Sequence, residues 1–235
     1  MKIQILGTGM VGRVLASRLV QLGHTVTMGT RDRRATLEKT APERIHGELA
    51  GQTFSDWHQE NPAVQLVDYA QTPPDSDLII NATNGQASLA ALAAVGPDKL
   101  KHKVLLDVAN PLDFSQGMPP SLFVCNTDSL AEQIQRAYPE SYVVKSLNTM
   151  NVYLMVNPAL LPGDHTVLVS GNRAEAKEMV QALLQEFGWK ASHIIDLGDI
   201  TTARATEMLL PVWIRLYGVL GTADFNFHIL RKQPA

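Results

Sequence analysis

The chain has 235 residues, of which 45% are hydrophobic and 18% charged, and its formal net charge is -3 at pH 7. These values are ordinary for a globular protein, and the 20 basic residues form no stripe that would favour nucleic acid. The single Cys125 excludes an internal disulfide and a thiolate-rich metal site. Because Cys125 follows the apolar run that begins at Leu122, we expect its side chain to be buried and unreactive.

No uninterrupted apolar run reaches the ~18 residues that a membrane-spanning helix needs. The start at Met1 leads directly into an apolar stretch, which leaves no room for a signal peptide. We therefore expect a cytoplasmic protein without a membrane segment.

The N-terminal stretch has the order strand, glycine loop, helix, strand. Apolar residues 2–6 precede a GxGxxG sequence at 7–12, an amphipathic segment covers 13–22, and a second strand-like run covers 25–28. The first glycine suits a tight turn, the second the approach of a pyrophosphate, and the third close packing of helix on strand. The N–H groups and dipole of the helix N-terminus favour an anion there. The pattern predicts a dinucleotide site at Gly7, Thr8, Gly9, Met10, Val11 and Gly12.

The end of the second strand indicates which dinucleotide is bound. NAD enzymes usually carry an acidic residue about 20 residues after the glycines, but here the sequence continues with Thr30 and Arg31. A hydroxyl and a guanidinium are suited to a 2'-phosphate, so we expect NADP(H). The alternative is a solvated turn in which the arginines pair with Asp32.

Two later strands end in small or amide residues. The apolar runs 77–83 and 104–111 resemble parallel strands buried on both faces. Ligands bind outside the carboxyl ends of such strands, so we expect Thr83, Asn84, Ala109 and Asn110 near the cofactor. The alternative is that the asparagines only make turns.

The remaining pattern completes a Rossmann-type α/β fold. Residues 35–62 predict a short helix followed by a loop-rich segment, in which we expect Trp57 to cover the sheet edge. Ser129 to Glu132 has the pattern of a capping box, which predicts the start of a helix. Strands that alternate with helices predict a doubly wound parallel sheet. We expect an NADP-binding domain at 1–150 and a small, mixed α+β part at 151–235 for substrate binding or dimerisation. For that part we expect strands at 166–170 and 194–197, helices at 173–187 and 200–220 (the second broken at Pro211), and an edge strand at 225–230.

With these segments in view, the chain resembles the coenzyme F420-dependent NADP oxidoreductase family. The resemblance covers nearly the whole length and includes residues 7–12, 29–31, 109–111, 145–149 and 163–165. It implies a homodimer, and NADP(H) contacts at Thr8 to Gly12, Thr30, Arg31, Arg34, Thr83, Ala109, Leu147 and Asn148. The same module looks like the cytosolic NADPH domain of membrane metalloreductases, but no membrane part is expected here.

Three functions follow from these observations. The first is hydride transfer between NADPH and a deazaflavin such as coenzyme F420, or a flavin, as the small-molecule acceptor, because these cofactors ask little acid–base chemistry of the protein. The second is a carbonyl or imine reductase with Lys145 as proton donor, although an ion-paired or solvated lysine at the sheet rim is the simpler interpretation. The third is an NADP(H)-binding sensor without turnover.

Further side chains bear on the second substrate and on metal binding. Residues 118–120, Met150, Met155 and Trp213 could form apolar walls for the acceptor, although Met and Trp more often belong to the core. His165, His193 and His228 show no ligand spacing, so we expect no metal.

Overall fold

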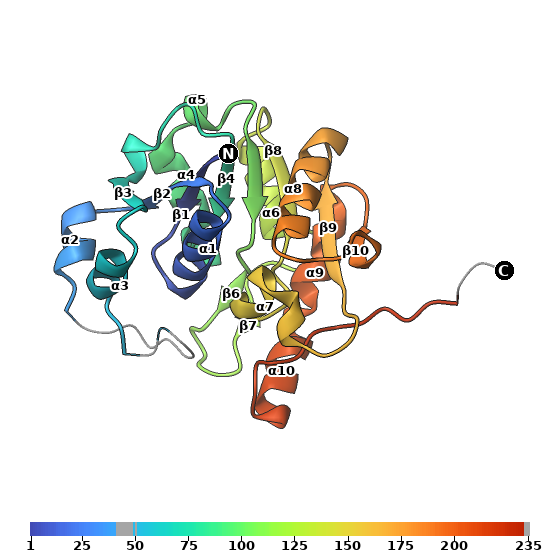
Figure 1. The fold of residues 1–235 in the computed structure, drawn as a ribbon. Coiled ribbons are helices and arrows are strands. Elements are labelled where there is room, and N and C mark those ends of the chain that lie inside the picture. Colours follow the sequence, from blue (N-terminus) through green and yellow to red (C-terminus); the bar gives the residue numbers. More distant parts are fainter. Residues whose placement is uncertain (41–48, 50, 233–235) are drawn as a thin grey trace.

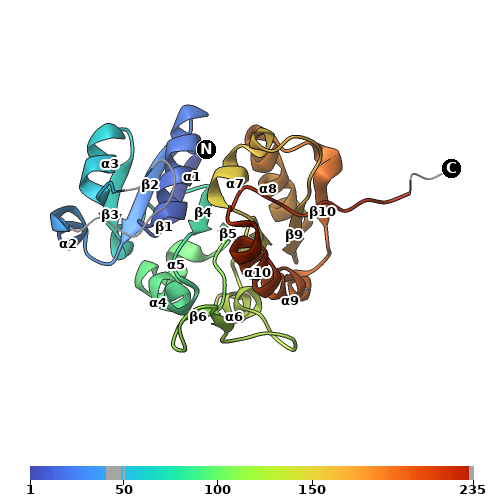
Figure 2. The same ribbon diagram turned by 90° about the horizontal axis from the view of Figure 1, so that it is seen from below.

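The computed structural model describes residues 1–40, 49 and 51–232. Within them one sheet has the order β10-β9-β8-β5-β4-β1-β2-β3, with helices on both faces (Figures 1 and 2). The strands of this sheet are β1 (Lys2–Leu6), β2 (Thr25–Thr30), β3 (Gln65–Asp68), β4 (Leu78–Asn81), β5 (Val104–Asp107), β8 (Tyr142–Ser146), β9 (Val167–Gly171) and β10 (Ile194–Asp196). A separate antiparallel pair joins β6 (Leu112–Asp113) to β7 (Ser121–Leu122).

The order of the strands reverses beside β1. Ile3 lies opposite Val26 of β2 on one side and Leu78 of β4 on the other, both in parallel register. The chain thus builds β2 and β3 outward, then returns to add β4, β5 and β8 on the opposite side, which leaves a crevice at the carboxyl ends. The expected doubly wound α/β fold is confirmed.

The C-terminal part extends the same sheet. Strand β9 runs antiparallel to β8, with Val144 opposite Gly171, whereas β10 is parallel to β9. This makes the last third mixed, as expected. The division into two domains at residue 150 stays a prediction.

Helices lie on both faces of the sheet (Figures 1 and 2). They are α1 (Met10–Gln21), α2 (Arg33–Glu38), α3 (Phe54–Glu60), α4 (Gly85–Val95), α5 (Pro97–Leu100), α6 (Leu130–Ala137), α7 (Val152–Val156), α8 (Ala174–Glu186), α9 (Ala203–Met208) and α10 (Leu210–Leu220). Half of the expected capping box of α6 is present: Ser129 Oγ accepts from Glu132 N at 3.1 Å, whereas the Glu132 carboxylate accepts from the Ser129 hydroxyl and from Arg204. Pro211 stands in the first turn of α10, which confirms the expected break between α9 and α10.

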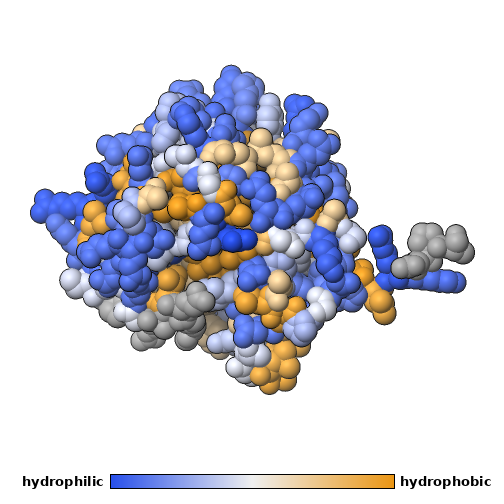
Figure 3. Space-filling view, viewed as in Figure 1, coloured by the Kyte–Doolittle hydropathy of each residue, from blue (hydrophilic) through white to orange (hydrophobic). Residues whose placement is uncertain are grey.

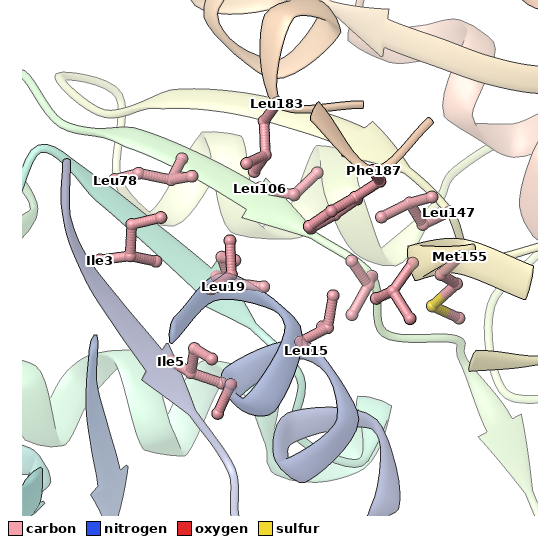
Figure 4. Close-up of a cluster of buried hydrophobic side chains, with 14 of the residues drawn as sticks. Ile3, Ile5, Leu15, Leu19, Leu78, Leu106, Leu147, Met155, Leu183 and Phe187 are labelled. Atoms are coloured by element: carbon pink, nitrogen blue, oxygen red, sulfur yellow. The ribbon is translucent and has the colours of Figure 1, made fainter. Parts of the chain in front are cut away.

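Successive side chains of the buried strands point to opposite faces of the sheet, which divides the core into two layers. Ile3 and Ile5 of β1 pack with Leu15 and Leu19 of α1. Figure 4 shows Leu183 of α8 and Phe187, the C-cap residue of this helix, in the same layer. Intervening positions face the opposite helices: Ile79, Leu105 and Val143 pack with α4 and α6 residues. Both faces of the central strands are therefore apolar, as parallel strands require.

The structure corrects three expectations. Cys125 is exposed, because it follows the short β7 strand in a surface loop and does not join the core. Residues 225–230 form no strand; instead they lie along the start of β9, where Thr166 N donates to Phe227 O at 2.9 Å. Trp57 lies on helix α3, not in a loop, because Thr53 and Asp56 form a capping box that starts this helix. The other part of that predicted loop, residues 41–48 and 50, lies outside the described residues.

Candidate active site at the carboxyl edge

A cavity of about 180 Å³ opens where β1, β4 and β5 end. The sequence predicted five of its lining residues: Val11, Thr83, Asn84, Ala109 and Asn110. It did not predict Ala82, Gly85, Val108, Leu112 and Phe114. The last two belong to the segment around β6, which is too short to show a periodic pattern.

The glycine loop has the geometry that a dinucleotide needs. Gly7 has φ +111°, and a Cβ on Gly12 would lie 2.1 Å from the Gly7 carbonyl oxygen, so both positions require glycine. A Cβ on Gly9 would meet nothing within 4 Å, which leaves open space in front of α1. Gly9 caps α1 without a side-chain hydrogen bond, and the first turn carries no acidic residue. The N-terminal N–H groups of α1 therefore fit a phosphate, with Thr8, Met10 and Val11 half-buried around them.

The corner after β2 places Arg31 differently from Thr30. Arg31 is exposed, and burial raises the pKa of the neighbouring Tyr69 phenol while the charge of Arg31 partly opposes that rise. Thr30 is buried, and its Oγ1 lies 2.8 Å from Thr36 Oγ1, whose own proton goes to the Asp32 carbonyl. The Thr30 proton is thus engaged with α2.

The neighbouring charged residues stabilise helix α2. Asp32 caps this helix by accepting from Ala35 N at 2.8 Å, so its carboxylate serves the backbone. The exposed Arg34 pairs with Glu38 at 2.7 Å. Arg31 is therefore the strongest candidate at this corner for contact with a 2'-phosphate.

The residues after β4 form one wall of the cavity. Thr83 Oγ1 donates to Asn81 Oδ1 at 2.7 Å and lies 3.0 Å from Ser88 Oγ, so these two side chains fix the position of the Thr83 hydroxyl. Asn84 caps α4 by accepting from Gln86 N at 3.0 Å, which is the turn-type role considered as its alternative. A Cβ on Gly85 would lie 2.0 Å from the Asn110 carbonyl oxygen, so α4 and the loop after β5 can meet closely. An Asn-Gly pair at the start of a helix was the only local signal for this contact.

The loops after β5 and β8 are joined by a reciprocal amide pair. Asn110 Nδ2 donates to the Asn148 carbonyl at 2.9 Å, and Asn148 Nδ2 donates to Asn110 Oδ1 at 2.9 Å. Leu147, 1% exposed, has φ +65°, a conformation that L residues seldom adopt and that often marks functional segments. The two predicted loops are therefore brought together, although Leu147 and Asn148 do not line the cavity itself.

Lys145 is completely buried and saturated with partners. Its Nζ lies 2.7 Å from Asp107 Oδ2 and 2.9 Å from Glu207 Oε1, and it also donates to the Ala109 carbonyl. Burial alone would lower the pKa of Lys145, but the two carboxylates outweigh burial and raise the pKa above its usual value of 10.5. The ion-paired interpretation is right and the solvated one wrong. An ammonium has three N–H groups, so none remains for a substrate.

Two of these partners were missed in the sequence. Asp107 is the one charge within the strand run 104–108, and Glu207 is the one acidic residue between 203 and 220. A charge in an otherwise apolar strand run was the available signal for Asp107, and a lone acidic residue between 203 and 220 was the signal for Glu207. Their common partner could not be read from spacing.

The other candidates lie elsewhere. Met150 and Met155 belong to the main core, Met118 is 70% exposed, and Trp213 stacks between Tyr217 and Phe225. His165 is buried with Nε2 2.9 Å from the Pro158 carbonyl, as expected for a satisfied core histidine. Across the described residues no group of three or more His, Cys, Asp or Glu side chains could hold a metal.

Comparisons with known proteins indicate the family of the chain. A family model for "NADP oxidoreductase coenzyme F420-dependent" matches residues 2–111. A crystal structure of a candidate F420-dependent NADP reductase from Arthrobacter sp. FB24 is 56% identical with a TM-score of 0.92, covering 98% of this chain and 100% of that one. The F420-dependent NADP reductase of Methanothermobacter marburgensis is 27% identical over 92% of each chain.

A further relative is much longer than this chain. The metalloreductase STEAP3 of Rattus norvegicus is 30% identical over 90% of this chain, which spans 38% of STEAP3. In the described part of this chain, no helix is both long and apolar enough to cross a membrane. By the family model and the 56% identical structure, the chain belongs to the coenzyme F420-dependent NADP oxidoreductase family and is an NADP-dependent oxidoreductase.

Proposed function

We propose that the protein transfers hydride between NADPH and a deazaflavin of the coenzyme F420 type, or a flavin. One observation carries this proposal: among the described residues that line the cavity, none has an ionisable side chain. Hydride exchange between two cofactor rings needs alignment and exclusion of water more than proton transfer. The names of two relatives, both described as F420-dependent NADP reductases, support the same acceptor.

Different residues along the crevice would bind different parts of NADPH. The backbone from Thr8 to Gly12 would hold the pyrophosphate at the N-terminus of α1, and Arg31 would bind the 2'-phosphate. Thr83 and the loop at Ala109 and Asn110 would orient the nicotinamide end, which supplies the hydride when NADPH is bound.

Another part of the cavity lining suits a second ring. Leu112 and Phe114 line the cavity, and Phe114 is 49% exposed, so its ring is available to a flat acceptor. Burial of such a ring against the nicotinamide would exclude water from the reacting atoms.

The structure weakens the carbonyl or imine reductase alternative. A proton donor must reach the reacting oxygen or nitrogen, whereas Lys145 is 0% exposed and its N–H groups are engaged by protein acceptors. The sensor alternative differs from both enzymes in lacking turnover.

An acceptor panel tests the proposal. We expect NADPH oxidation with coenzyme F420 or a flavin, followed by loss of the reduced nicotinamide absorbance, and none with ketones or imines. Tight NADPH binding without oxidation by F420, flavins, quinones or ferric chelates would favour the sensor. Reduction of carbonyls or imines alone would favour the second alternative.

A pair of phenylalanine variants tests where the acceptor binds. Phe114→Ala should raise the acceptor KM by about tenfold, because a ring of the cavity wall is lost. Phe123→Ala is the matched control, since Phe123 is also exposed in the segment that contains β6 and β7 but does not line the cavity. Equal effects of both variants would contradict the assigned wall.

We also propose a cytoplasmic homodimer. Apolar side chains gather at the foot of the molecule, where α10 lies (Figure 3), and those of Val212, Tyr217, Val219 and Leu220 are exposed. Such a contiguous apolar surface is typical of an association face. Sedimentation should give the mass of a dimer, and Val219→Glu should shift the measured mass to that of a monomer. A monomeric wild-type protein would refute the proposed dimer.

The thiol of Cys125 is free and exposed, which suits a reducing compartment such as the cytoplasm.

A further inference from the structure

A continuous chain of buried hydrogen bonds runs beneath the cavity. It begins at Thr83, whose hydroxyl donates to Asn81, and Asn81 Nδ2 donates to Asp107 Oδ1 at 2.8 Å. The other oxygen of Asp107 accepts from Lys145, which also contacts Glu207 on α9. These hydrogen bonds therefore link a residue that lines the cavity to the C-terminal part of the protein.

The same cluster holds the cavity wall at Ala109 through both the N–H and the carbonyl of that residue. The Ala109 carbonyl accepts from Lys145 Nζ, and Ala109 N lies 3.3 Å from Asp107 Oδ1. Ala109 lines the cavity and is 4% exposed. Its position is thus determined by charged groups that do not themselves line the cavity.

Glu207 ties this wall to two helices. Its carboxylate accepts from Leu130 N at 2.8 Å and from Ala131 N at 3.1 Å, at the start of α6. These N–H groups help to neutralise the second carboxylate beside the single ammonium. Helix α9 is thereby fixed between α6 and the cavity wall.

Next to Glu207, the backbone of α9 reaches the other loop of the site. The carbonyl of Thr206 accepts from Asn148 Nδ2 at 3.2 Å, and the same amide donates to Asn110 Oδ1. Residues from β5, β8 and α9 therefore form one connected wall. The left-handed Leu147 lies at the bend that makes this connection.

We infer that Lys145, Asp107 and Glu207 are positioning residues, which hold the wall at Ala109 and Asn110 against α9 and so set the geometry of hydride transfer. Their side chains are at most 1% exposed, so they act through the wall and do not touch the reacting rings. Displacement of reacting atoms by about 1 Å can slow a reaction by roughly a hundredfold. This inference rests on the proposed function, because the wall matters for rate only if the nicotinamide lies against it.

Glu207→Gln tests the inference with little change of shape and leaves the Lys145–Asp107 pair neutral. We expect kcat for NADPH oxidation by the acceptor of the wild-type enzyme to fall about tenfold or more, with NADPH Kd changed by less than about twofold. The primary isotope effect with deuterated NADPH should increase, because hydride transfer becomes slower than the other steps. Should this variant not fold, Glu207→Asp keeps the charge, shortens the reach and should show the same pattern.

Arg204→Gln is the matched control. Arg204 lies on the same helix and pairs with Glu132 of α6 at 2.8 Å, but it does not line the cavity or contact the buried cluster. In this variant an ion pair between the same two helices is lost, while kcat and the isotope effect should remain within about twofold of wild type. Hydrogen exchange should show faster exchange over residues 108–112 in Glu207→Gln and not in Arg204→Gln.

The outcomes separate the two proposals. Wild-type protein that does not bind NADPH would refute the proposed function, whatever the variants do. Wild-type turnover combined with an unchanged kcat in Glu207→Gln, or with an equal loss in Arg204→Gln, would overturn the positioning role alone. A shift of the pH–rate profile in Glu207→Gln would also overturn it, because a positioning group should leave the titrating groups unchanged.

Discussion

Gly9 is a position where a side chain should affect the ligand and spare the fold. Its φ of -71° and ψ of -175° are open to any residue, and a Cβ there would meet no atom within 4 Å. The open space lies at the N-terminus of α1, where we propose that the pyrophosphate binds. Gly9→Ala should therefore weaken NADPH binding while the protein remains folded.

The magnitude of each effect follows from the local geometry. Ala is a poorer N-cap than Gly by roughly 0.5–1 kcal/mol, whereas loss of Gly flexibility in the unfolded chain contributes about 0.4–1 kcal/mol of opposite sign. The free energy of unfolding should thus change by less than about 1 kcal/mol. A methyl that holds the phosphates away from the backbone forfeits a charge-assisted hydrogen bond of about 1.5–3 kcal/mol, or roughly a tenfold to hundredfold rise in Kd.

Calorimetric titration with NADPH and urea unfolding measure these two quantities. Gly12→Ala provides the contrast, because its Cβ would lie 2.1 Å from the Gly7 oxygen and must separate α1 from the loop. That variant should lose about 1–3 kcal/mol of stability as well as affinity. An NADPH Kd for Gly9→Ala within about twofold of wild type would refute the proposed approach of the phosphates.

Three further predictions concern charged groups. Arg31→Ala should raise the Kd of NADPH about tenfold or more and that of NADH by less than about twofold, and equal losses in calorimetry would overturn the 2'-phosphate assignment. Lys145→Met should lower the free energy of unfolding at pH 7 by about 3–5 kcal/mol, because two buried carboxylates lose their cation. Because the folded-state pKa of Lys145 is raised, the stabilisation of the fold by its ammonium is present below pH 10.5 and is lost as the pH rises through the folded pKa. Urea unfolding should therefore show the stability difference between wild type and Lys145→Met shrinking only in that high pH range. A hydrogen bond from Arg136 lowers the pKa of Asp128 to about 2 from 3.8, so this pair stabilises the fold above pH 3.8 and loses that effect as the pH falls through about 2. In Arg136→Ala an NMR titration should find the pKa of Asp128 nearer 3.8, and an unchanged pKa would exclude Arg136 as the cause.

Part of the site was predictable because its signals are local. The glycine spacing predicted the turn at Gly7 and the contact at Gly12, and strand ends predicted the cavity residues Thr83 and Ala109. The hydroxyl of Thr30 shows the limit of such reasoning. Its residue type suits a phosphate, but the fold directs its proton to Thr36.

The sequence by itself determined the layers of the sheet and the dinucleotide loop. Runs such as 78–80 and 104–106 are apolar without interruption, so they predict strands buried on both faces wherever they pair. The close approach of Gly12 to the Gly7 carbonyl oxygen is likewise specified within a few residues of chain.

Only the tertiary structure decided the partners of Lys145 and the second wall of the cavity. A buried ammonium takes whichever acceptors packing brings to it, and here these come from β5 and from α9. Phe114 and Cys125 show the same dependence, because the exposure of a side chain in an irregular segment is set by what covers it. Contacts between distant segments depend on how the layers pack, and no spacing along the chain encodes them.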